Sequence, residues 1–322
     1  MKEKTVCVTG AGGFVASWLV RRLLSSSSGG GYLVHGTVRD PSDAKNDHLR
    51  EMNGAAERLR LFKADVLDKA SVAAAVAGCG GVFHVASPVP AGKPRDPDAE
   101  VLGPAVAGTR NVVEAAGEAG VRRVVVVSSA AAVILDPAFP RDAVLGEDAW
   151  SDDHYCRSIE NWYCLSKTLA EREAWRYAVE NSEMDVVTVC PPLVLGPLLQ
   201  STVNTSSSIL INLLKGDQEK AAKDKRRNVV DVRDVADALV LTYENPAASG
   251  RYICSAYNLK VSEMADIVRR FYPDINYPKF VGEEDERLLS SKKLQKLGWK
   301  FRTVEECLRD SVQSYKAAGI LK

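Results

Sequence analysis

A glycine-rich turn directly after the first apolar segment constrains the fold more than any other feature of the chain. Thr5–Thr9 has the pattern of a short buried strand, and Gly10, Gly12 and Gly13 separate it from a helix with an apolar face. Gly10 allows a sharp turn, Gly13 has no Cβ to keep a phosphate away, and Ala16 is small enough for close helix packing. An ordinary tight turn has similar glycines, but the position at the start of a strand–helix pattern favours a dinucleotide site.

Further apolar segments alternate with helical stretches along much of the chain. The predicted strands are Tyr32–Val38, Leu59–Lys63, Gly81–Val85, Val124–Val127 and Val186–Cys190. Short buried strands that alternate with helices imply right-handed crossovers and a parallel sheet covered on both faces. We therefore predict an α/β fold with a doubly wound parallel sheet of the Rossmann type.

The length of the chain predicts a second lobe. A single core usually stops growing at about 250 to 300 residues, and this chain has 322. From about Leu195 the alternation becomes less regular. We predict a dinucleotide-binding domain over residues 1–194, to which residues 229–243 return, and a smaller, mostly helical substrate-binding lobe over residues 195–322.

Composition excludes several classes of function. The 42 Lys and Arg balance the 42 Asp and Glu, which argues against a nucleic-acid binder. No apolar run has the length of about 18 to 20 residues that spans a bilayer, and no signal-peptide core is present, so we expect a cytoplasmic protein without a membrane partner. The seven scattered cysteines, the absence of a CxxC pair and the four histidines argue for reduced thiols and no metal site. We expect a monomer or a weak homodimer.

The end of the second predicted strand indicates which dinucleotide binds. Arg39 presents a guanidinium suited to a 2′-phosphate, where NAD-dependent enzymes tend to have a carboxylate, so NADP(H) is the expected cofactor. Asp40 argues against this, unless it is the first polar residue of the turn at Pro41. Lys45 either adds a second charge or is solvated. At the end of the third strand, Asp65 and the following Val66 are placed to receive the adenine, unless Asp65 only forms a turn.

A tyrosine and a lysine with helical spacing are the candidates for the chemistry. Tyr163 and Lys167 are four residues apart, so in a helix they lie on one face. A lysine cation and a nicotinamide cation nearby would favour the phenolate, so we expect a lowered pKa for Tyr163 when both are present. Ser128 and Ser129 follow a predicted strand, at the sheet edge where open α/β sheets bind ligands.

Together these motifs carry a family resemblance. Thr9–Ala16, Ser128–Ser129, Tyr163 with Lys167, and Asp231–Ala236 resemble an extended short-chain dehydrogenase/reductase. Four other segments resemble the plant cinnamoyl-CoA reductase and dihydroflavonol reductase group: Val82–Pro88, Asn161–Cys164, Leu193–Gln200 and Gly250–Ser255. The resemblance covers nearly the whole chain.

The resemblance implies a role for each matching residue. Tyr163 becomes the proton donor, Lys167 holds the nicotinamide ribose and lowers the tyrosine pKa, and Ser129 polarises the substrate carbonyl, with Ser128 as the alternative. It implies hydride transfer from NADPH to a carbonyl carbon, and for a thioester the release of an aldehyde and free CoA. The implied cofactor contacts are Gly10, Gly12, Gly13, Phe14, Val15, Ala16, Arg39, Lys45, Asp65, Val66, Val85, Ala86, Ser87, Tyr163, Lys167, Pro191, Leu193 and Val194.

The chain also departs from the group's pattern. Cys164-Leu165-Ser166 stands where the group has Cys-Tyr-Gly, and Ile209 and Asn212 stand where we expect a histidine and a lysine linked to CoA recognition. These differences weaken the CoA thioester interpretation but not hydride transfer, so reduction of an aromatic aldehyde or a dihydroflavonol-type ketone is the alternative. The non-enzymatic alternative is an NADP(H)-sensing regulator, against which the complete Tyr, Lys and Ser set argues.

Two of the cysteines lie close to the candidate chemistry in the sequence. Cys156 and Cys164 are eight residues apart. Cys156 precedes Tyr163, and Cys164 follows it directly. They form either a redox-sensitive pair or two separate thiols, and a reduced compartment favours separate thiols.

Overall fold

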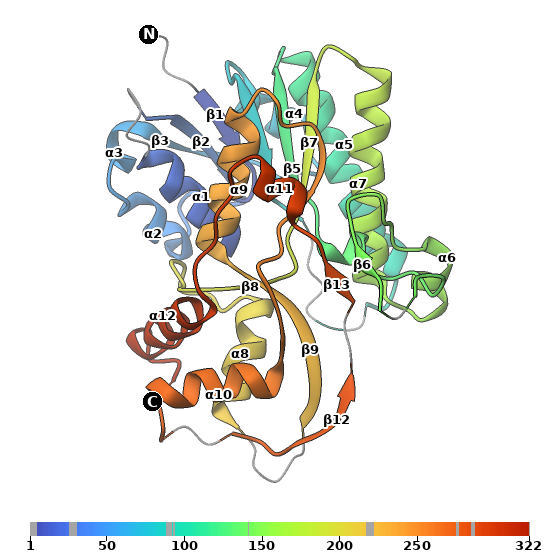
Figure 1. Cartoon of the computed structure of the whole chain (residues 1–322). Coiled ribbons are helices and arrows are strands. Elements are labelled where there is room, and N and C mark those ends of the chain that lie inside the picture. The colour runs from blue at the N-terminus through green and yellow to red at the C-terminus, as the bar shows by residue number, and fades with distance from the viewer. Residues whose placement is uncertain are drawn as a thin grey trace.

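A seven-stranded sheet, in which every strand is parallel to its neighbours, forms the centre of the larger lobe (Figure 1). The computed structural model describes residues 5–25, 31–87, 92, 94–140, 142–216, 222–274, 277–284 and 287–321. The winding direction reverses between β1 (Thr5–Val8) and β4 (Gly81–His84), which is where ligands bind in open parallel sheets. The predicted doubly wound fold is confirmed. In spatial order the strands are β10 (Gly250–Ile253), β7 (Asp185–Cys190), β5 (Arg123–Val127), β4 (Gly81–His84), β1 (Thr5–Val8), β2 (Leu33–Val38) and β3 (Leu59–Lys63).

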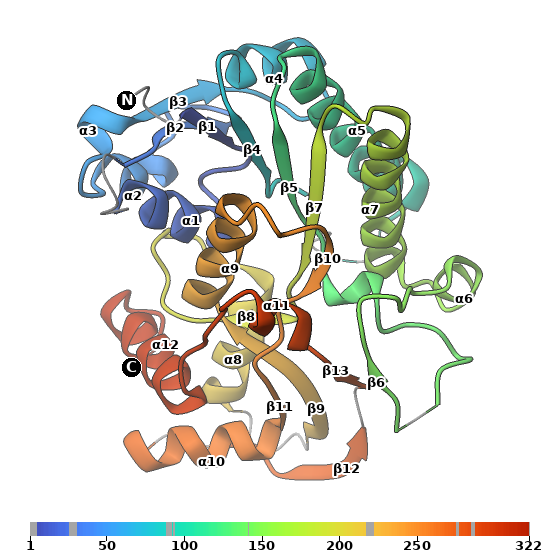
Figure 2. The ribbon, with the colours of Figure 1, turned by 45° about the horizontal axis from the view of Figure 1, so that its top comes forward.

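Helices cover both faces of this sheet, as Figure 2 shows. On one face α1 (Phe14–Leu24) packs against α9 (Val232–Glu244), and on the other lie α4 (Lys69–Val76), α5 (Gly103–Glu118) and α7 (Trp162–Glu180). Side chains of a strand alternate between faces, so Val125 and Val127 of β5 join the first core while Val124 and Val126 join the second. Both cores bury these valines, which explains the continuous apolar run in the sequence.

Short helical segments connect the larger elements. η1 (Ala44–Asn46), α2 (Asp47–Arg50) and α3 (Ala55–Arg58) follow β2, and η3 (Ala130–Ala132) follows β5. The π-helical η2 (Asp98–Leu102) leads into α5, and α6 (Asp153–Ser158) precedes α7. Among the described residues, no helix combines the length and apolarity needed to cross a bilayer.

The smaller lobe lies beyond the carboxyl ends of the large sheet (Figure 1). Besides helices it contains a small sheet in the order β11, β9, β12, with β8 also pairing to β9. The sequence did not show this sheet because charged residues dominate β9. The elements are β8 (Leu193–Leu195), α8 (Thr205–Lys215), β9 (Ala222–Asp231), β11 (Tyr257–Lys260), α10 (Val261–Phe271), β12 (Phe280–Glu284), α11 (Lys292–Lys296) and α12 (Val304–Ala317), and β6 (Val144–Leu145) pairs with β13 (Leu288–Leu289).

The chain returns from the smaller lobe to the large sheet in two elements. α9 lies against α1, where Arg22 and Asp237 form an ion pair of 2.6 Å. β10 then adds a strand beside β7. The sequence pattern predicts that residues 229–243 return to the larger lobe, but it does not predict β10 there, because pairing between strands so far apart in sequence has no local signal.

Candidate active site

The glycine turn between β1 and α1 has the geometry of a cradle for a phosphate. Gly10 has a φ of +66°, and a Cβ there would lie 3.1 Å from the Cβ of Ala86, so only glycine fits without strain. Among the described residues no side chain caps the N-terminus of α1 at Gly13. Phe14 and Ala16 are buried, and Val15 is half-buried. The free backbone N–H groups of the first turn of α1 are the donors that an anion would contact.

The same turn is held from the side by η1. A Cβ on Gly12 would lie 2.4 Å from Oδ1 of Asn46, and Nδ2 of Asn46 donates to the carbonyl of Asp40 at 2.9 Å. The segment after β2 therefore packs directly on the turn, which brings the residues that follow Arg39 close to it.

Thr9 joins the turn to the end of β4, a link that the sequence analysis missed. Its Oγ1 accepts hydrogen bonds from the backbone N–H of Val85 and of Ala86, both at 3.0 Å. Val85, Ala86 and Ser87 are half-buried beside the glycine turn. The sequence shows a threonine at the end of the first strand, but it does not show which backbone groups that threonine binds.

The Thr9 hydroxyl also determines the state of His84. Because Oγ1 of Thr9 accepts two N–H groups, its own proton goes to Nδ1 of His84 at 3.0 Å, and Nε2 of the ring then donates to Thr109 at 3.2 Å. Burial, and then the charge of Lys167, lower the pKa of His84 to about 3. The imidazole is therefore a neutral linker between β1, β4 and α5.

At the end of β2 the arginine and the aspartate have different environments. Arg39 is exposed. Oδ1 of Asp40 accepts from the backbone N–H and the hydroxyl of Ser42, at 2.9 and 2.7 Å, and these hydrogen bonds lower its pKa. Asp40 is thus a turn residue. Lys45 is also exposed, and its ammonium forms an ion pair of 2.6 Å with Asp43.

Asp65 and Val66 follow β3 at the same edge of the sheet. Oδ1 of Asp65 accepts from the N–H of Leu67 at 2.9 Å, which is the turn-forming role that the sequence left as the alternative. Val66 lies against α5, because a Cβ on Gly108 would be 2.8 Å from its Cγ2. Its carbonyl accepts from Nδ2 of Asn111 at 2.8 Å.

The structure brings Ser129 and Tyr163 together at the carboxyl end of β5. The Ser129 hydroxyl lies near enough to the phenol to lower its pKa. Ser129 is 8% exposed and also caps η3, since Oγ accepts from the N–H of Ala131 at 3.1 Å. Tyr163 belongs to the first turn of α7, where Asn161 caps the helix by accepting from the N–H of Cys164.

Burial dominates the pKa of Tyr163 in this structure. Burial raises the pKa of the phenol above its ordinary value, and the nearby Ser129 hydroxyl lowers it only in part. The cost of removing the phenolate from water outweighs the stabilisation by Ser129. The tyrosine is therefore protonated at neutral pH, which is the state a proton donor needs.

Lys167 lies one turn further along α7 and is almost completely buried. It is 7% exposed, and Nζ donates to the carbonyl of Val127 at 3.1 Å. Burial lowers its pKa to about 8, while the negative charge of Glu171 opposes the shift. Ser128, the alternative to Ser129, instead donates its hydroxyl to Glu171 at 2.6 Å, so it points away from the tyrosine.

The segment after β7 closes the site on one side. The carbonyl of Pro191 accepts from the N–H of Ala130 at 2.9 Å, next to Ser129. Leu193 and Val194 begin β8, where they pair with Val229 and Val230 of β9. This segment therefore connects the candidate site to the smaller lobe.

Cys156 and Cys164 are free and buried, and both belong to one small apolar cluster. They lie in α6 and α7 respectively. In the described part of the chain, no group of three or more His, Cys, Asp or Glu side chains is arranged to hold a metal ion.

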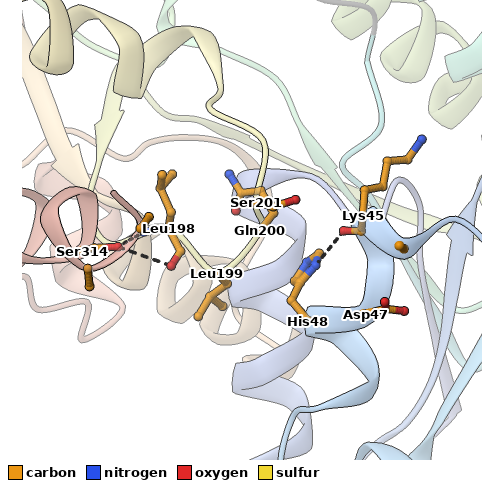
Figure 3. A pocket seen from close by; sticks show the side chains of 11 residues that line it. Lys45, Asp47, His48, Leu198, Leu199, Gln200, Ser201 and Ser314 are labelled. Carbon is orange, nitrogen blue, oxygen red and sulfur yellow. Dashed lines mark hydrogen bonds between the residues drawn. The ribbon is translucent and has the colours of Figure 1, made fainter. Parts of the chain in front are cut away.

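A cavity of about 420 Å³ lies where the two lobes meet, and Figure 3 shows its lining. Lys45 and His48 come from the segment after β2, whereas Leu198 and Gln200 follow β8 and Ser314 belongs to α12. The cavity therefore adjoins the Lys45 side of the dinucleotide cradle rather than Tyr163.

Comparisons with known proteins agree with this geometry. A model of the NAD dependent epimerase/dehydratase family matches residues 6–259. The chain is 47% identical to cinnamoyl-CoA reductase 2 of Medicago truncatula over 99% of this chain and 93% of that protein. It is 41% identical to tetraketide alpha-pyrone reductase 1 of Arabidopsis thaliana, over 98% of this chain and 96% of that protein.

Solved structures extend the agreement to the fold. Vestitone reductase from alfalfa is 32% identical with a TM-score of 0.86, and the match covers 98% of this chain and 99% of that one. Yeast methylglyoxal/isovaleraldehyde reductase Gre2, solved with NADPH, is 29% identical with the same TM-score of 0.86 and the same coverage, 98% and 99%. The chain therefore belongs to the NAD dependent epimerase/dehydratase family, the extended short-chain dehydrogenases/reductases, and is an oxidoreductase similar to the plant cinnamoyl-CoA reductases.

Proposed function

We propose that this protein uses NADPH to reduce a phenylpropanoid-type carbonyl, and that its substrate is a hydroxycinnamoyl-CoA thioester, which it converts to the aldehyde. One observation carries the chemistry: Ser129 and the nearby Tyr163 share the carboxyl end of β5 with the buried ammonium of Lys167. The thioester substrate is supported by 43 to 47% identity to several cinnamoyl-CoA reductases over 99% of the chain.

The residues present fit a nicotinamide dinucleotide. The positive φ of Gly10 and the uncapped start of α1 suit the pyrophosphate. Preference for NADP(H) is supported by the exposed Arg39 and by the engagement of Asp40 with Ser42, which leaves the arginine as the group available to a 2′-phosphate. Lys45 would add a second charge after leaving Asp43.

The remaining cofactor contacts follow from their positions around the cradle. Asp65 and Val66 would meet the adenine, Val85 to Ser87 the pyrophosphate side, and Pro191 to Val194 the nicotinamide. This assignment is supported by the hydrogen bonds that hold Ala86 against the glycine turn and Pro191 against the Ser129 segment.

The chain's own residues supply the proton and the electrostatics. When bound, the reduced nicotinamide supplies a hydride to the carbonyl carbon. Tyr163, protonated at neutral pH, hydrogen-bonds the oxygen as it becomes negative, and Ser129 donates a second hydrogen bond to it. Lys167 holds a positive charge beside them. For a thioester, the adduct then expels CoA as the carbon–sulfur bond breaks; the aldehyde forms and the thiolate takes up a proton.

A second candidate has a specific observation in its favour. Ile209 and Asn212 lie three residues apart on the exposed face of α8, where the reductase pattern has a histidine and a lysine. Without a cation at these positions the helix offers less to a CoA phosphate, which favours an aromatic aldehyde or a dihydroflavonol-type ketone as substrate.

The experiment that separates the two candidates compares a thioester with its own aldehyde. NADPH consumption is followed by its near-ultraviolet absorbance with feruloyl-CoA and with coniferaldehyde. A higher kcat/KM for the thioester supports the first proposal, and a higher value for the aldehyde supports the second. Tight NADPH binding without turnover of either would contradict both.

A further inference from the structure

A fully buried carboxylate lies directly behind the candidate active site. Glu171 is one turn of α7 beyond Lys167, and its side chain has no exposed area. Oε1 accepts from Nε of Arg251 and from the hydroxyl of Thr188, both at 2.7 Å, and Oε2 accepts from the hydroxyl of Ser128 at 2.6 Å. A buried carboxylate with this many donors has one fixed orientation.

Arg251 fixes that carboxylate to two other parts of the molecule. It belongs to the edge strand β10, and NH1 donates to the carbonyls of Glu147 and Ala149 at 2.9 and 2.7 Å. Its guanidinium also stacks 3.6 Å from the ring centre of Trp150. The pair therefore joins α7, β10 and the loop before α6 around Glu171.

Ser128 connects this pair to the proposed catalytic groups. It stands between Val127, whose carbonyl accepts from Lys167, and Ser129, whose hydroxyl lies near Tyr163. The side chain that Glu171 anchors is thus attached to a backbone segment that carries both the acceptor of the lysine and the hydroxyl of Ser129.

We propose that Glu171 is a positioning residue of this reductase: held by Arg251, it anchors Ser128 and so places the Ser129 hydroxyl and the Val127 carbonyl for the reaction. It touches neither substrate nor cofactor in this role. The inference rests on the proposed functions of Ser129, Tyr163 and Lys167. The negative charge of Glu171 also favours the charged form of Lys167.

Variants of two residues whose hydroxyls both donate to Glu171 distinguish a positioning role from a purely structural one. Ser128→Ala and Thr188→Val each remove one buried hydroxyl that donates to Glu171, at 2.6 and 2.7 Å respectively. Both variants lose a similar hydrogen bond and are expected to lower the thermal midpoint by similar amounts. We expect Ser128→Ala to lower kcat by about tenfold or more, because misplaced reacting groups are costly, and Thr188→Val to keep kcat within about twofold of the parent.

Glu171→Gln tests the carboxylate itself through the pH profile. The amide keeps the shape of the side chain and removes its charge. Without the anion, Lys167 loses its proton at a lower pH, so the alkaline limb of kcat/KM moves down by about one unit. NADPH affinity, measured by fluorescence titration, is expected to stay near the parent value. A structural defect alone does not move this limb.

Each outcome decides between the alternatives. Reduced kcat in Ser128→Ala with a normal Thr188→Val, or a shifted alkaline limb in Glu171→Gln, supports the inference. If Glu171→Gln does not fold, the serine and threonine pair still decides it. Equal kcat in both hydroxyl variants with an unmoved limb overturns it. Tyr163→Phe is assayed alongside: full activity there would show that the proposed catalytic roles, rather than the positioning role, are wrong.

Discussion

The carboxyl edge of β5 and the exposed face of α8 are built in opposite ways. At the first, Ser129, Lys167 and Glu171 are buried, and each side chain forms a hydrogen bond with another residue of the protein. At the second, Ile209 is 36% exposed and Asn212 is also exposed. A change at the buried edge leaves polar groups without partners, whereas a change on α8 costs little stability. Under the proposed function, the reacting groups are thus fixed in place, whereas residues on the exposed face of α8 can change at little cost in stability.

The largest expected effect comes from removing the phenol at the buried edge. Tyr163→Phe is expected to lower kcat by about a hundredfold or more, since it removes the proton donor, while NADPH affinity stays nearly unchanged. NADPH consumption and fluorescence titration measure the two quantities. Tyr177→Phe, further along the same helix α7, is the matched control. Unchanged turnover would remove Tyr163 from the mechanism.

The second effect is expected at the exposed end of β2, where, as on α8, a substitution costs little stability. Arg39→Asp is expected to lower the preference for NADPH over NADH by about 10- to 100-fold, the value of a hydrogen bond between charged groups. Arg60→Asp, exposed on the adjacent β3, makes the same charge change and is the control. If Arg39→Asp keeps the preference for NADPH over NADH, another residue binds the 2′-phosphate.

The third effect is a pH dependence that belongs to the buried edge. Burial lowers the pKa of Lys167 to about 8, and a lysine is a cation only below its pKa. Raising the pH to one unit above that value removes the charge from most molecules, so kcat/KM is expected to fall about tenfold. Lys167→Arg, whose guanidinium stays charged, is expected to have a lower rate without this alkaline limb. A flat profile in the parent would contradict the assignment.

The smallest effect is expected on α8. Ile209→His combined with Asn212→Lys restores the cationic pattern and is expected to raise kcat/KM for a CoA thioester about fivefold relative to its aldehyde, since exposed charge pairs contribute little. Thr205→Lys at the exposed start of α8 controls for added charge. An equal gain with both substrates would show that this face does not recognise CoA.

The comparison also explains how much of the site was visible in the sequence. The Tyr163 and Lys167 spacing and the glycine turn are local patterns, and each lies on the element that was predicted for it. Glu171 has the same helical spacing from Lys167, so a third polar residue on that face was the missed signal. Arg251 had no such signal, because its partners come from segments far apart in the chain. The burial that raises the pKa of Tyr163 in this structure had no signal either, since the sequence does not report burial.

The sequence by itself determined the doubly wound sheet, the dinucleotide turn and the pair on one helix face, because periodicity and spacing act over a few residues. The tertiary structure decided that β10 joins the large sheet, that Ser129 rather than Ser128 meets Tyr163, and that Asp40 serves a turn. These features depend on which residues from distant parts of the sequence are buried together. Desolvation of these residues and the hydrogen bonds between them exist only in the folded chain.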